Sequence, residues 1–434
     1  MLESVLIANR GEIARRVIRA CRALGVRSIA VYSEADAGWP HVTDADEAVL
    51  IGPAPARESY LDGQRILTAA RERGAQAIHP GYGFLSENWR FAKACEEAGL
   101  VWIGPPWRVI QQMGDKVGAR REMQRAGVPV VPGSEGPVGS AEEARRMAGE
   151  IGYPVMLKAA AGGGGIGMVK VADAAALEQS YAAAERRAQA AFGAPALFVE
   201  RYLTQPRHVE VQIFGDARGR VVHLHERECS IQRRHQKLIE ESPAPSLTSD
   251  LKEQLTAAAV TGATSVGYVN AGTVEFIVQG REYYFLEMNT RLQVEHPVTE
   301  EVTGRDLVQE QLKVASGEPL TWRQEDIVQR GASIECRIYA EDAARNFMPS
   351  PGTLVRWVPP EGPGLRLESG VTDKLVATGA TREEARARME AALEAFVIEG
   401  VKTVIPFHLR VMRSAAFREG RVHTQLVEQG AFNA

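Results

Sequence analysis

The feature that most limits the possible folds is the alternation of short apolar runs with helical patterns through the first hundred residues. Runs rich in β-branched residues occupy 4–8 and 28–32, and between them apolar residues recur at helical spacing from Ile13 to Leu24. A further helical pattern and a short run at 77–79 continue the alternation. Strands that alternate with helices predict a parallel, doubly wound α/β sheet whose strand ends carry the ligand loops.

The composition excludes several classes of protein. At roughly 150 residues per domain, 434 residues predict about three domains. The net charge of −4 gives no attraction to a nucleic acid backbone or to an anionic membrane, so we expect neither as a partner. The 4 cysteines are scattered without a C-x-x-C spacing, which argues against a disulfide framework or a zinc site. With an acidic residue instead of basic ones near the N-terminus, we expect a cytoplasmic protein.

The pattern changes twice along the rest of the chain. A linker-like stretch at 127–133, rich in Gly, Pro and Val, suggests a boundary near residue 130. From Pro154 to Glu295, strands of period two with long loops predict a mixed antiparallel α+β unit. The stretch 349–352 marks another break, and a β-rich piece with a helix follows it. The chain is therefore predicted to combine α/β and α+β architecture.

The strongest local motif is the glycine run at 162–167. It fits G-x-G-x-x-G literally, but the following residues 168–171 are typical of a strand, whereas a dinucleotide fold requires a helix there. It also lacks the Lys-Ser/Thr pair of a Walker A motif. A glycine loop between two strands predicts a mobile hairpin whose backbone N–H groups close over phosphates, with Lys158 adding a positive charge. A flexible linker is the alternative interpretation.

Two alternating runs, 273–278 and 283–289, predict a hairpin that carries acidic residues. With a three-residue loop at 280–282, Glu275 would lie directly opposite Glu287. Two facing carboxylates repel each other unless a cation lies between them, and with Asn289 they form a donor set suited to Mg²⁺ held with a nucleotide. A register slip of one residue would instead leave two surface glutamates on opposite faces.

The residues after this hairpin suit anion and proton chemistry. Arg291 offers a planar fork for a carboxylate-like anion, Gln293 a neutral donor, and Glu295 a candidate base. Upstream, the stretch 223–237 admits either a zinc site, whose spacings fit poorly, or a basic cluster that faces phosphates and a small anion. The chain has 42 Arg and only 9 Lys, so lysines at 116, 158 and 237 suggest that a compact ammonium is needed there.

Several long motifs cover nearly the whole chain. They are IANRGEIA at 7–14, HPGYGFLSEN at 79–88, MGDK at 113–116, the glycine run, QRRHQK at 232–237, EMNTRLQVEH at 287–296 and IECRI at 334–338. Together they resemble biotin carboxylase, the ATP-grasp component of biotin-dependent acyl-CoA and pyruvate carboxylases.

The resemblance implies three domains. Residues 1–114 would form the N-terminal, pre-ATP-grasp domain with the doubly wound sheet, and residues 115–330 the ATP-grasp domain. Within the latter, about 131–204 would form a lid subdomain that includes the mobile glycine loop. Residues 331–434 would form a mixed α+β C-terminal domain.

The resemblance also implies roles for individual residues. In the family, the residues that match Lys116, Lys158, Gly164, Gly165, Glu200, Leu203, His208 and His235 bind ATP, and those that match Glu275, Glu287 and Asn289 hold Mg²⁺ or Mn²⁺. The residues that match Lys237, Arg291, Gln293 and Val294 hold bicarbonate. The match to Glu295 is the base, the match to Arg337 stabilises the biotin enolate, and the match to Tyr82 lines the pocket.

The implied reaction is the ATP-dependent carboxylation of biotin by bicarbonate through carboxyphosphate. The chain lacks a biotinylation motif and a carboxyltransferase-sized extension, so we expect biotin to arrive on a separate carrier protein and carboxyltransferase subunits to act afterwards. An acetyl-CoA-type carboxylase in fatty acid synthesis is the expected setting, and the family implies a homodimer.

The sequence departs from the family in one larger segment. After Val371 the chain is about a dozen residues shorter than the family pattern. Two other functions are alternatives. One is another ATP-grasp carbon–nitrogen ligase, and the other is an ATP-binding regulatory or assembly subunit that has lost turnover.

Overall fold

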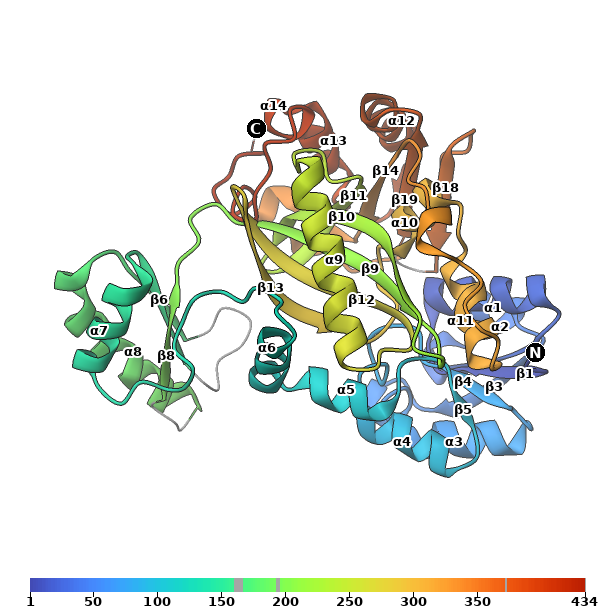
Figure 1. The fold of residues 1–434 in the computed structure, drawn as a ribbon. Helices are drawn as coiled ribbons and strands as arrows, with labels where there is room; N and C mark the ends of the chain where they lie inside the picture. The colour runs from blue at the N-terminus through green and yellow to red at the C-terminus, as the bar shows by residue number, and fades with distance from the viewer. Residues whose placement is uncertain (160–166, 193–195, 371–372, 434) are drawn as a thin grey trace.

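The computed structural model of the protein describes residues 1–159, 167–192, 196–370 and 373–433 (Figure 1). The N-terminal part contains a parallel sheet in the order β3-β2-β1-β4-β5. The strands are β1 (Ser4–Ile7), β2 (Arg27–Ser33), β3 (Glu47–Gly52), β4 (Ala77–His79) and β5 (Val101–Trp102). The predicted parallel sheet is confirmed, although the sequence patterns did not predict β3.

Helices separate these strands as the alternation predicted. They are α1 (Gly11–Leu24), α2 (Pro40–Asp44), α3 (Gly63–Glu72), α4 (Trp89–Glu97) and α5 (Trp107–Gly114). The apolar face of α1, which includes Ile13 and Val17, is buried in a core with β1. Gly25 ends α1 in a left-handed conformation (φ 69°), which glycine adopts without a Cβ clash. Helix α1 begins at Gly11, a short loop after the carboxyl end of β1 at Ile7.

A long antiparallel sheet forms the centre of the molecule and runs in the order β13-β12-β9-β10-β11-β14-β19-β18. Its strands are β9 (Arg207–Gly215), β10 (Val221–Arg233), β11 (Gln236–Ser242), β12 (Asn270–Gln279), β13 (Glu282–Asn289), β14 (Ala332–Ile338), β18 (Leu365–Ser369) and β19 (Asp373–Gly379). The chain segments predicted as separate ATP-grasp and C-terminal units therefore share one sheet.

One face of this sheet is apolar and packs against a helix. Val209, Val211 and Ile213 of β9 share a core with α9 (Ser249–Ser265), which crosses the sheet in Figure 1. The side chains between them, His208, Glu210 and Gln212, point to the opposite face because strand side chains alternate. The fold therefore produces a buried polar face on the inner side of the sheet.

Further elements surround this sheet. They are α6 (Lys116–Arg125), α10 (His296–Thr303), α11 (Leu307–Ala315), α12 (Arg382–Ala395), α13 (Ile405–Arg413), α14 (Ala415–Arg418), β15 (Glu341–Asp342), β16 (Met348–Pro349), β17 (Arg356–Val358) and β20 (Val397–Glu399). Helix α10 contacts β10, β11 and β14. Helices α12 and α13 bury Met389 and Val411 against β14 and β19. No described helix is long and apolar enough to cross a membrane.

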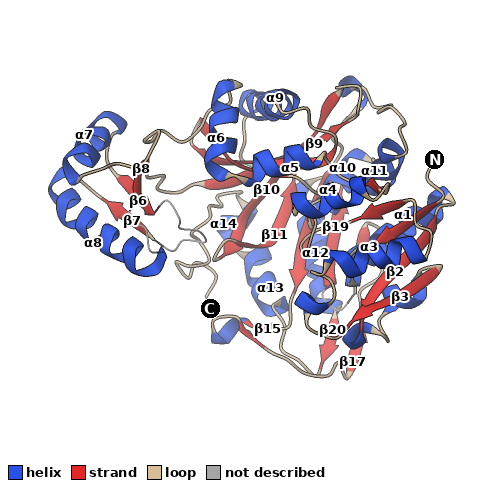
Figure 2. Ribbon diagram, turned by 90° about the horizontal axis from the view of Figure 1, so that it is seen from below, coloured by secondary structure: helices blue, strands red, loops and turns tan. Residues whose placement is uncertain are grey.

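A small unit stands away from this body in both ribbon views (Figures 1 and 2). It contains a sheet in the order β7-β6-β8, with β6 (Val155–Ala159), β7 (Met168–Val171), β8 (Leu197–Arg201), α7 (Ala141–Ile151) and α8 (Ala174–Phe192). Strands β6 and β7 pair antiparallel on either side of the glycine run, as predicted for a hairpin. Gly164 and Gly165 lie outside the described residues.

The segment in which the chain is shorter than the family pattern joins β18 to β19. The two strands pair from Leu365 with Ala377 to Ser369 with Asp373. Residues 371 and 372, at the point of the sequence departure, lie outside the described residues. Strand β19 therefore enters the central sheet within a few residues of the end of β18.

The close approach of Tyr268 to β12 gives a test of this fold. A Cβ at Gly272 would lie 2.1 Å from the Tyr268 hydroxyl oxygen, which also donates to the Ala271 carbonyl at 3.0 Å. Since Tyr268 is fully buried, we expect Gly272→Ala to lower the free energy of unfolding by about 1–3 kcal/mol. Urea denaturation measures this change. Gly114→Ala, where a Cβ meets no atom within 4 Å, is the control, and equal midpoints for the two variants would contradict the packing.

Candidate functional site

The ammonium of Lys237 lies at the centre of the buried polar face. Its Nζ is 2.5 Å from Glu210 Oε2, 2.8 Å from Glu275 Oε1 and 2.6 Å from Glu295 Oε1. Burial disfavours the charged amine, but the three carboxylates outweigh burial and raise the pKa of Lys237 well above its usual value. Strands β9, β11 and β12 and the loop before α10 are thus held together by one buried cation.

Glu295 also contacts a second cation. Arg337 of β14 lies with Nη2 2.9 Å from Glu295 Oε2, and its Nε donates to Glu240 Oε1 at 2.6 Å. Burial favours the neutral form of Glu295, yet Lys237 and Arg337 together lower its pKa well below the usual range. Glu295 is therefore ionised at neutral pH and is flanked by two donors that an incoming anion could also use.

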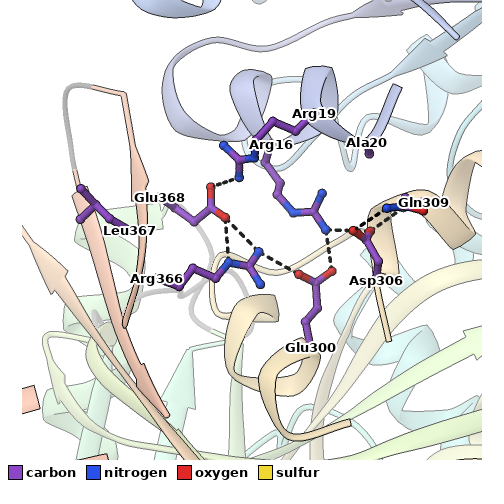
Figure 3. A pocket seen from close by; sticks show the side chains of 9 residues that line it. All are labelled: Arg16, Arg19, Ala20, Glu300, Asp306, Gln309, Arg366, Leu367 and Glu368. Carbon is purple, nitrogen blue, oxygen red and sulfur yellow. Dashed lines mark hydrogen bonds and ion pairs between the residues drawn. The ribbon is translucent and has the colours of Figure 1, made fainter. Parts of the chain in front are cut away.

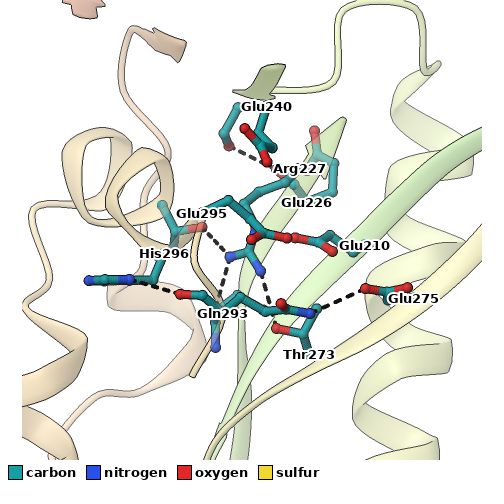
Figure 4. A network of polar contacts seen from close by, with 12 residues as sticks. Glu210, Glu226, Arg227, Glu240, Thr273, Glu275, Gln293, Glu295 and His296 are labelled. Carbon is teal, nitrogen blue, oxygen red and sulfur yellow. Dashed lines mark hydrogen bonds and ion pairs between the residues drawn. The ribbon is translucent and has the colours of Figure 1, made fainter. Parts of the chain in front are cut away.

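Arg227 is fully buried beneath this cluster and was not predicted from the sequence. Its Nε donates to Glu210 Oε1 at 2.5 Å, and its Nη1 donates to Gln212 Oε1 at 2.8 Å and to Thr299 Oγ1 at 2.9 Å (Figure 4). Its Nη2 donates to Thr273 Oγ1 at 3.1 Å. Arg227 thus links the central sheet to α10 through Thr299, and it holds the carboxylate of Glu210 in position.

The predicted facing of Glu275 and Glu287 is confirmed, but the loop length assumed for it is wrong. Gln279 pairs with Glu282, so the hairpin has a two-residue turn, and this register alone would offset the two glutamates by one residue. A bulge between Glu275 and Phe276 shifts the register by one and restores the pair. Leu286 is the extra residue, and its side chain is exposed.

The donors of this hairpin fit a divalent cation. Burial and the charge of Glu275 raise the pKa of Glu287, while Lys237 and His208 overcome burial and lower the pKa of Glu275. Asn289, two residues beyond Glu287 on β13, is buried and its Nδ2 has no partner among the described residues. Hard oxygen donors with excess negative charge form a suitable set for Mg²⁺ or Mn²⁺.

The loop after β13 brings Arg291 and Gln293 to the same region. Arg291 Nη2 donates to Asn289 Oδ1, and Arg291 Nη1 donates to Gln293 Oε1, both at 2.9 Å. Gln293 Nε2 in turn donates to Glu275 Oε1 at 3.2 Å, and Arg291 Nε donates to Glu87 Oε2 at 2.9 Å. Glu87 comes from the HPGYGFLSEN motif, which explains why that distant segment is part of the site.

His208 belongs to the same cluster, with Nε2 3.0 Å from Glu275 Oε2. Of the other predicted nucleotide residues, Lys116 lies at the edge of the cluster, with Nζ 3.6 Å from Glu287 Oε2. Lys158 and Glu200 form an ion pair with each other in the small unit, and among the described residues no hydrogen bond or ion pair joins them to the cluster. Leu203 is buried just beyond β8.

His235 is exposed in the turn between β10 and β11. Its side chain has no hydrogen bond or ion pair with the cluster among the described residues, so the structure does not join it to the other predicted residues. The zinc interpretation of 223–237 is not supported either. His225 Nε2 lies 3.0 Å from the Ile327 carbonyl oxygen, and His223 packs its ring against that of His225.

Tyr82, the residue predicted to line the biotin pocket, lies near Lys374, which contacts the loop after β13. Lys374 Nζ lies 5.7 Å from the centre of the Tyr82 ring and donates to the Val294 carbonyl at 2.9 Å. The same Nζ is 3.2 Å from Glu12 Oε2 at the start of α1. Lys374 was not predicted, although it is one of only 9 lysines in the chain.

A cavity of about 470 Å³ lies elsewhere, between α1, α10, α11 and β18 (Figure 3). Its charged lining is internally paired: Arg16 Nη2 lies 2.8 Å from Glu300 Oε1, and Arg366 Nη2 lies 2.8 Å from Glu300 Oε2. It contains none of the predicted site residues.

Comparisons with known proteins agree with this geometry. Family models match residues 1–110 (biotin carboxylase, N-terminal domain), 115–323 (carbamoyl-phosphate synthase L chain, ATP binding domain) and 335–429 (biotin carboxylase C-terminal domain). A pyruvate carboxylase subunit of Methanothermobacter thermautotrophicus is 51% identical over 99% of this chain and 90% of its own length. Biotin carboxylase 1 of Bacillus subtilis is 50% identical over 99% of this chain and 98% of its own length.

A solved structure is similar over the whole chain. It is the biotin carboxylase domain dimer of Hydrogenobacter thermophilus 2-oxoglutarate carboxylase, in complex with MgADP, ADP and bicarbonate. It has a TM-score of 0.91 and 48% identity, and the match covers 100% of this chain and 99% of that one.

The buried acids Glu240 and Glu368 give opposite pH dependences of stability. Burial, partly offset by Arg337, raises the pKa of Glu240 from 4.5 to about 7. The folded state then binds this proton more tightly than the unfolded chain, so its contribution to stability falls as pH rises from 4.5 to 7. Against burial, Arg366 and Arg19 lower the pKa of Glu368 from 4.5 to about 2, so its contribution is present above 4.5 and is lost as pH falls.

Glu240→Gln is therefore expected to gain up to about 3 kcal/mol of unfolding free energy relative to wild type as pH rises from about 4.5 to 7. Glu368→Gln is expected to be less stable than wild type at pH 7, and this deficit shrinks below pH 4.5. Urea denaturation across this pH range measures both. Parallel curves for the two variants would contradict the assigned electrostatics.

Proposed function

This chain belongs to the biotin carboxylase family, and we propose that the cluster around Lys237 carries out ATP-dependent carboxylation of biotin with bicarbonate. The observation that carries this proposal is the position of Glu295 between Lys237 and Arg337, both within 2.9 Å of its oxygens. A carboxylate between two cations can accept a proton from a small anion that those cations also bind. The products are carboxybiotin, ADP and phosphate.

Bicarbonate is held by Lys237, Arg291, Gln293 and the backbone at Val294 in this proposal. When the anion binds, it competes with Glu295 for the ammonium of Lys237. Glu295 then loses part of its stabilising positive charge, which raises its proton affinity at the moment when a bicarbonate O–H comes within reach. The site thus couples anion binding to activation of the base.

The nucleotide lies between the small unit and the central sheet. Its contacts are Lys116, Lys158, Gly164, Gly165, Glu200, Leu203, His208 and His235. Of these, Lys116, Lys158, Glu200, His208 and His235 supply charged or polar groups. The pairing of Lys158 with Glu200 keeps the Lys158 ammonium in place. Glu275, Glu287 and Asn289 hold Mg²⁺ or Mn²⁺, which neutralises charge on the phosphates when it is bound.

The site acts mainly by holding bicarbonate and the γ-phosphoryl group of ATP in position to react. A bicarbonate oxygen attacks the γ-phosphorus of ATP, the bond to the β-phosphate oxygen breaks, and ADP leaves, while Glu295 takes the bicarbonate proton. Carboxyphosphate breaks its C–O bond to give CO₂ and phosphate, and this phosphate removes the ureido N–H proton of biotin. The ureido nitrogen then attacks CO₂, with Arg337 stabilising the enolate oxygen and Tyr82 lining the pocket.

The domain division, partners and location are part of the same proposal. Domains at 1–114, 115–330 and 331–434, with the lid at about 131–204, are supported by family matches that leave gaps at 111–114 and 324–334. Family membership supports a biotin carrier protein and carboxyltransferase subunits as partners, and the dimeric relative supports a homodimer. Four buried cysteines without disulfides support a reducing cytoplasm.

The expected assignment to an acetyl-CoA-type carboxylase is only loosely supported. Two of the similar proteins belong to a pyruvate carboxylase and to a 2-oxoglutarate carboxylase. We therefore propose the biotin carboxylation step itself and assign no acceptor. The matched carboxylase models and the presence of Arg337 at the site disfavour another carbon–nitrogen ligase.

Glu295→Gln tests the proposed base. We expect wild-type protein to release phosphate from MgATP only with bicarbonate, and free biotin to increase the rate. The variant should lose about 10²–10⁴-fold in bicarbonate-dependent turnover while it still binds MgATP.

Glu300→Gln is a matched control, since Glu300 is also buried between two cations, Arg16 and Arg366, but lies outside the cluster. Equal losses of bicarbonate-dependent turnover in Glu295→Gln and Glu300→Gln would show that Glu295 is not the base. If wild-type protein binds ATP but releases no phosphate, the result would instead support the alternative of an ATP-binding regulatory or assembly subunit without turnover.

A further inference from the structure

The turn between β10 and β11 is strained. Arg233 pairs with Gln236, which leaves Arg234 and His235 as a two-residue turn, and both have positive φ angles, 48° and 65°. Such turns favour Asn and Gly, and side chains such as Arg and His adopt this region at a cost. Strain of this kind persists where the surroundings enforce it, and it is common at functional sites.

A second segment with positive φ angles lies beside this turn. Asn346 (φ 54°), a residue type that tolerates this region, ends a short helix after β15, and Phe347 (φ 56°), for which the region is unfavourable, follows it. Arg233 joins the two turns: its Nη1 donates at 3.3 Å to the carbonyl oxygens of both Asn346 and Phe347. Its guanidinium carbon lies 4.5 Å from the centre of the Phe347 ring, and its Nη2 lies 3.4 Å from Glu341 Oε2.

The geometry of these contacts requires arginine. One planar group reaches two carbonyls, a carboxylate and an aromatic face at once, which a single ammonium cannot do. The Arg233 side chain is 13% exposed, so these contacts are largely shielded from water. The link therefore joins a segment of the C-terminal part firmly to the turn that carries His235.

The last part of the chain adds further contacts in the same region. The Arg234 backbone N–H donates to Glu428 Oε1 at 3.3 Å. The Thr424 backbone N–H donates to the Pro206 carbonyl at 3.0 Å, and Gln425 Nε2 donates to the Tyr202 hydroxyl at 3.3 Å. The connection from β8 to β9 and the β10–β11 turn are thus both held from the C-terminal side.

We propose that Arg233 is a positioning residue for the nucleotide, which holds the turn at 234–235 so that His235 is presented to ATP. The inference deepens the proposed function and rests on it, since it takes His235 as a nucleotide contact. The segment 341–347 thereby controls nucleotide affinity without touching the nucleotide. Bicarbonate binding at Lys237 and Arg291 is expected to be independent of it.

Arg233→Gln tests this role by titration calorimetry with MgATP and by steady-state kinetics on the full chain. Because the variant frees the strained turn, we expect the Kd for MgATP to rise about tenfold, with the KM for bicarbonate unchanged. Arg233→Lys keeps the positive charge but lacks the planar guanidinium, so its Kd for MgATP should lie between those of wild type and Arg233→Gln.

Arg382→Gln is a matched control. The Arg382 guanidinium carbon lies 4.6 Å from the centre of the Phe417 ring, Nη2 donates to the Phe417 carbonyl at 2.8 Å, and Nε lies 2.6 Å from Glu241 Oε2. Its loss should reduce stability as Arg233→Gln does but leave the Kd for MgATP at the wild-type value. Equal Kd values for the two variants would overturn the proposal.

A double-mutant cycle separates positioning from general destabilisation. If Arg233 acts through His235, Arg233→Gln adds no further loss of MgATP affinity in a His235→Ala background. Additive losses would overturn the proposal. If Arg233→Gln does not fold, Glu341→Gln replaces it in the cycle, with a smaller increase in Kd expected. Wild-type protein that binds no MgATP would count against the proposed function itself, not only against the role of Arg233.

Discussion

The structure of the site depends on one buried ammonium that three carboxylates share. If the charge of Lys237 were absent, three anionic carboxylates would lie within a few ångströms of one another in a water-poor interior, which is strongly unfavourable. These are Glu210, Glu275 and Glu295. Arg227 beneath the cluster and Arg337 beside it supply the remaining positive charge. This charge balance lets a sheet carry an acidic inner face while its outer face packs against α9.

The same balance bears on the function proposed for the site. In that proposal bicarbonate meets Lys237, which already neutralises Glu295, and a divalent cation meets Glu275, which Lys237 and His208 already neutralise. The substrates would then exchange partners with groups that already neutralise one another, so little new charge would have to be buried. The central sheet runs from β13 to β18, so one sheet carries the groups proposed to hold the metal ion and bicarbonate and to stabilise the biotin enolate.

Much of the fold and of the site could be predicted from the sequence, and the exceptions have physical causes. The β-α alternation predicted the N-terminal parallel sheet, and the motif from Glu287 to Glu295 predicted a polar loop next to the acidic hairpin, where Arg291 and Gln293 do lie. The Glu275–Glu287 pair was correct only because a bulge at Leu286 compensated for a turn shorter than expected. A local pattern gives no signal for such a bulge.

Other residues were missed because their role depends on distant contacts. Arg227 and Glu210 lie in the region where alternating strands were predicted, and Lys374 lies in the piece predicted only as β-rich. The sheet order is what brings Arg227 and Glu210 to one cluster and Lys374 to the Val294 carbonyl beside it. Glu87 reaches Arg291 across 204 residues of sequence. Buried arginines in a chain rich in arginine cannot be distinguished from surface ones by composition alone.

In the proposed reaction, a bicarbonate oxygen attacks the γ-phosphoryl group of ATP. The most direct test is turnover of MgATP with ¹⁸O-labelled bicarbonate, followed by mass spectrometry of the phosphate released. We expect one bicarbonate oxygen in each phosphate, because the C–O bond of carboxyphosphate breaks after the new P–O bond has formed. Phosphate that carries oxygen only from ATP and water would contradict it.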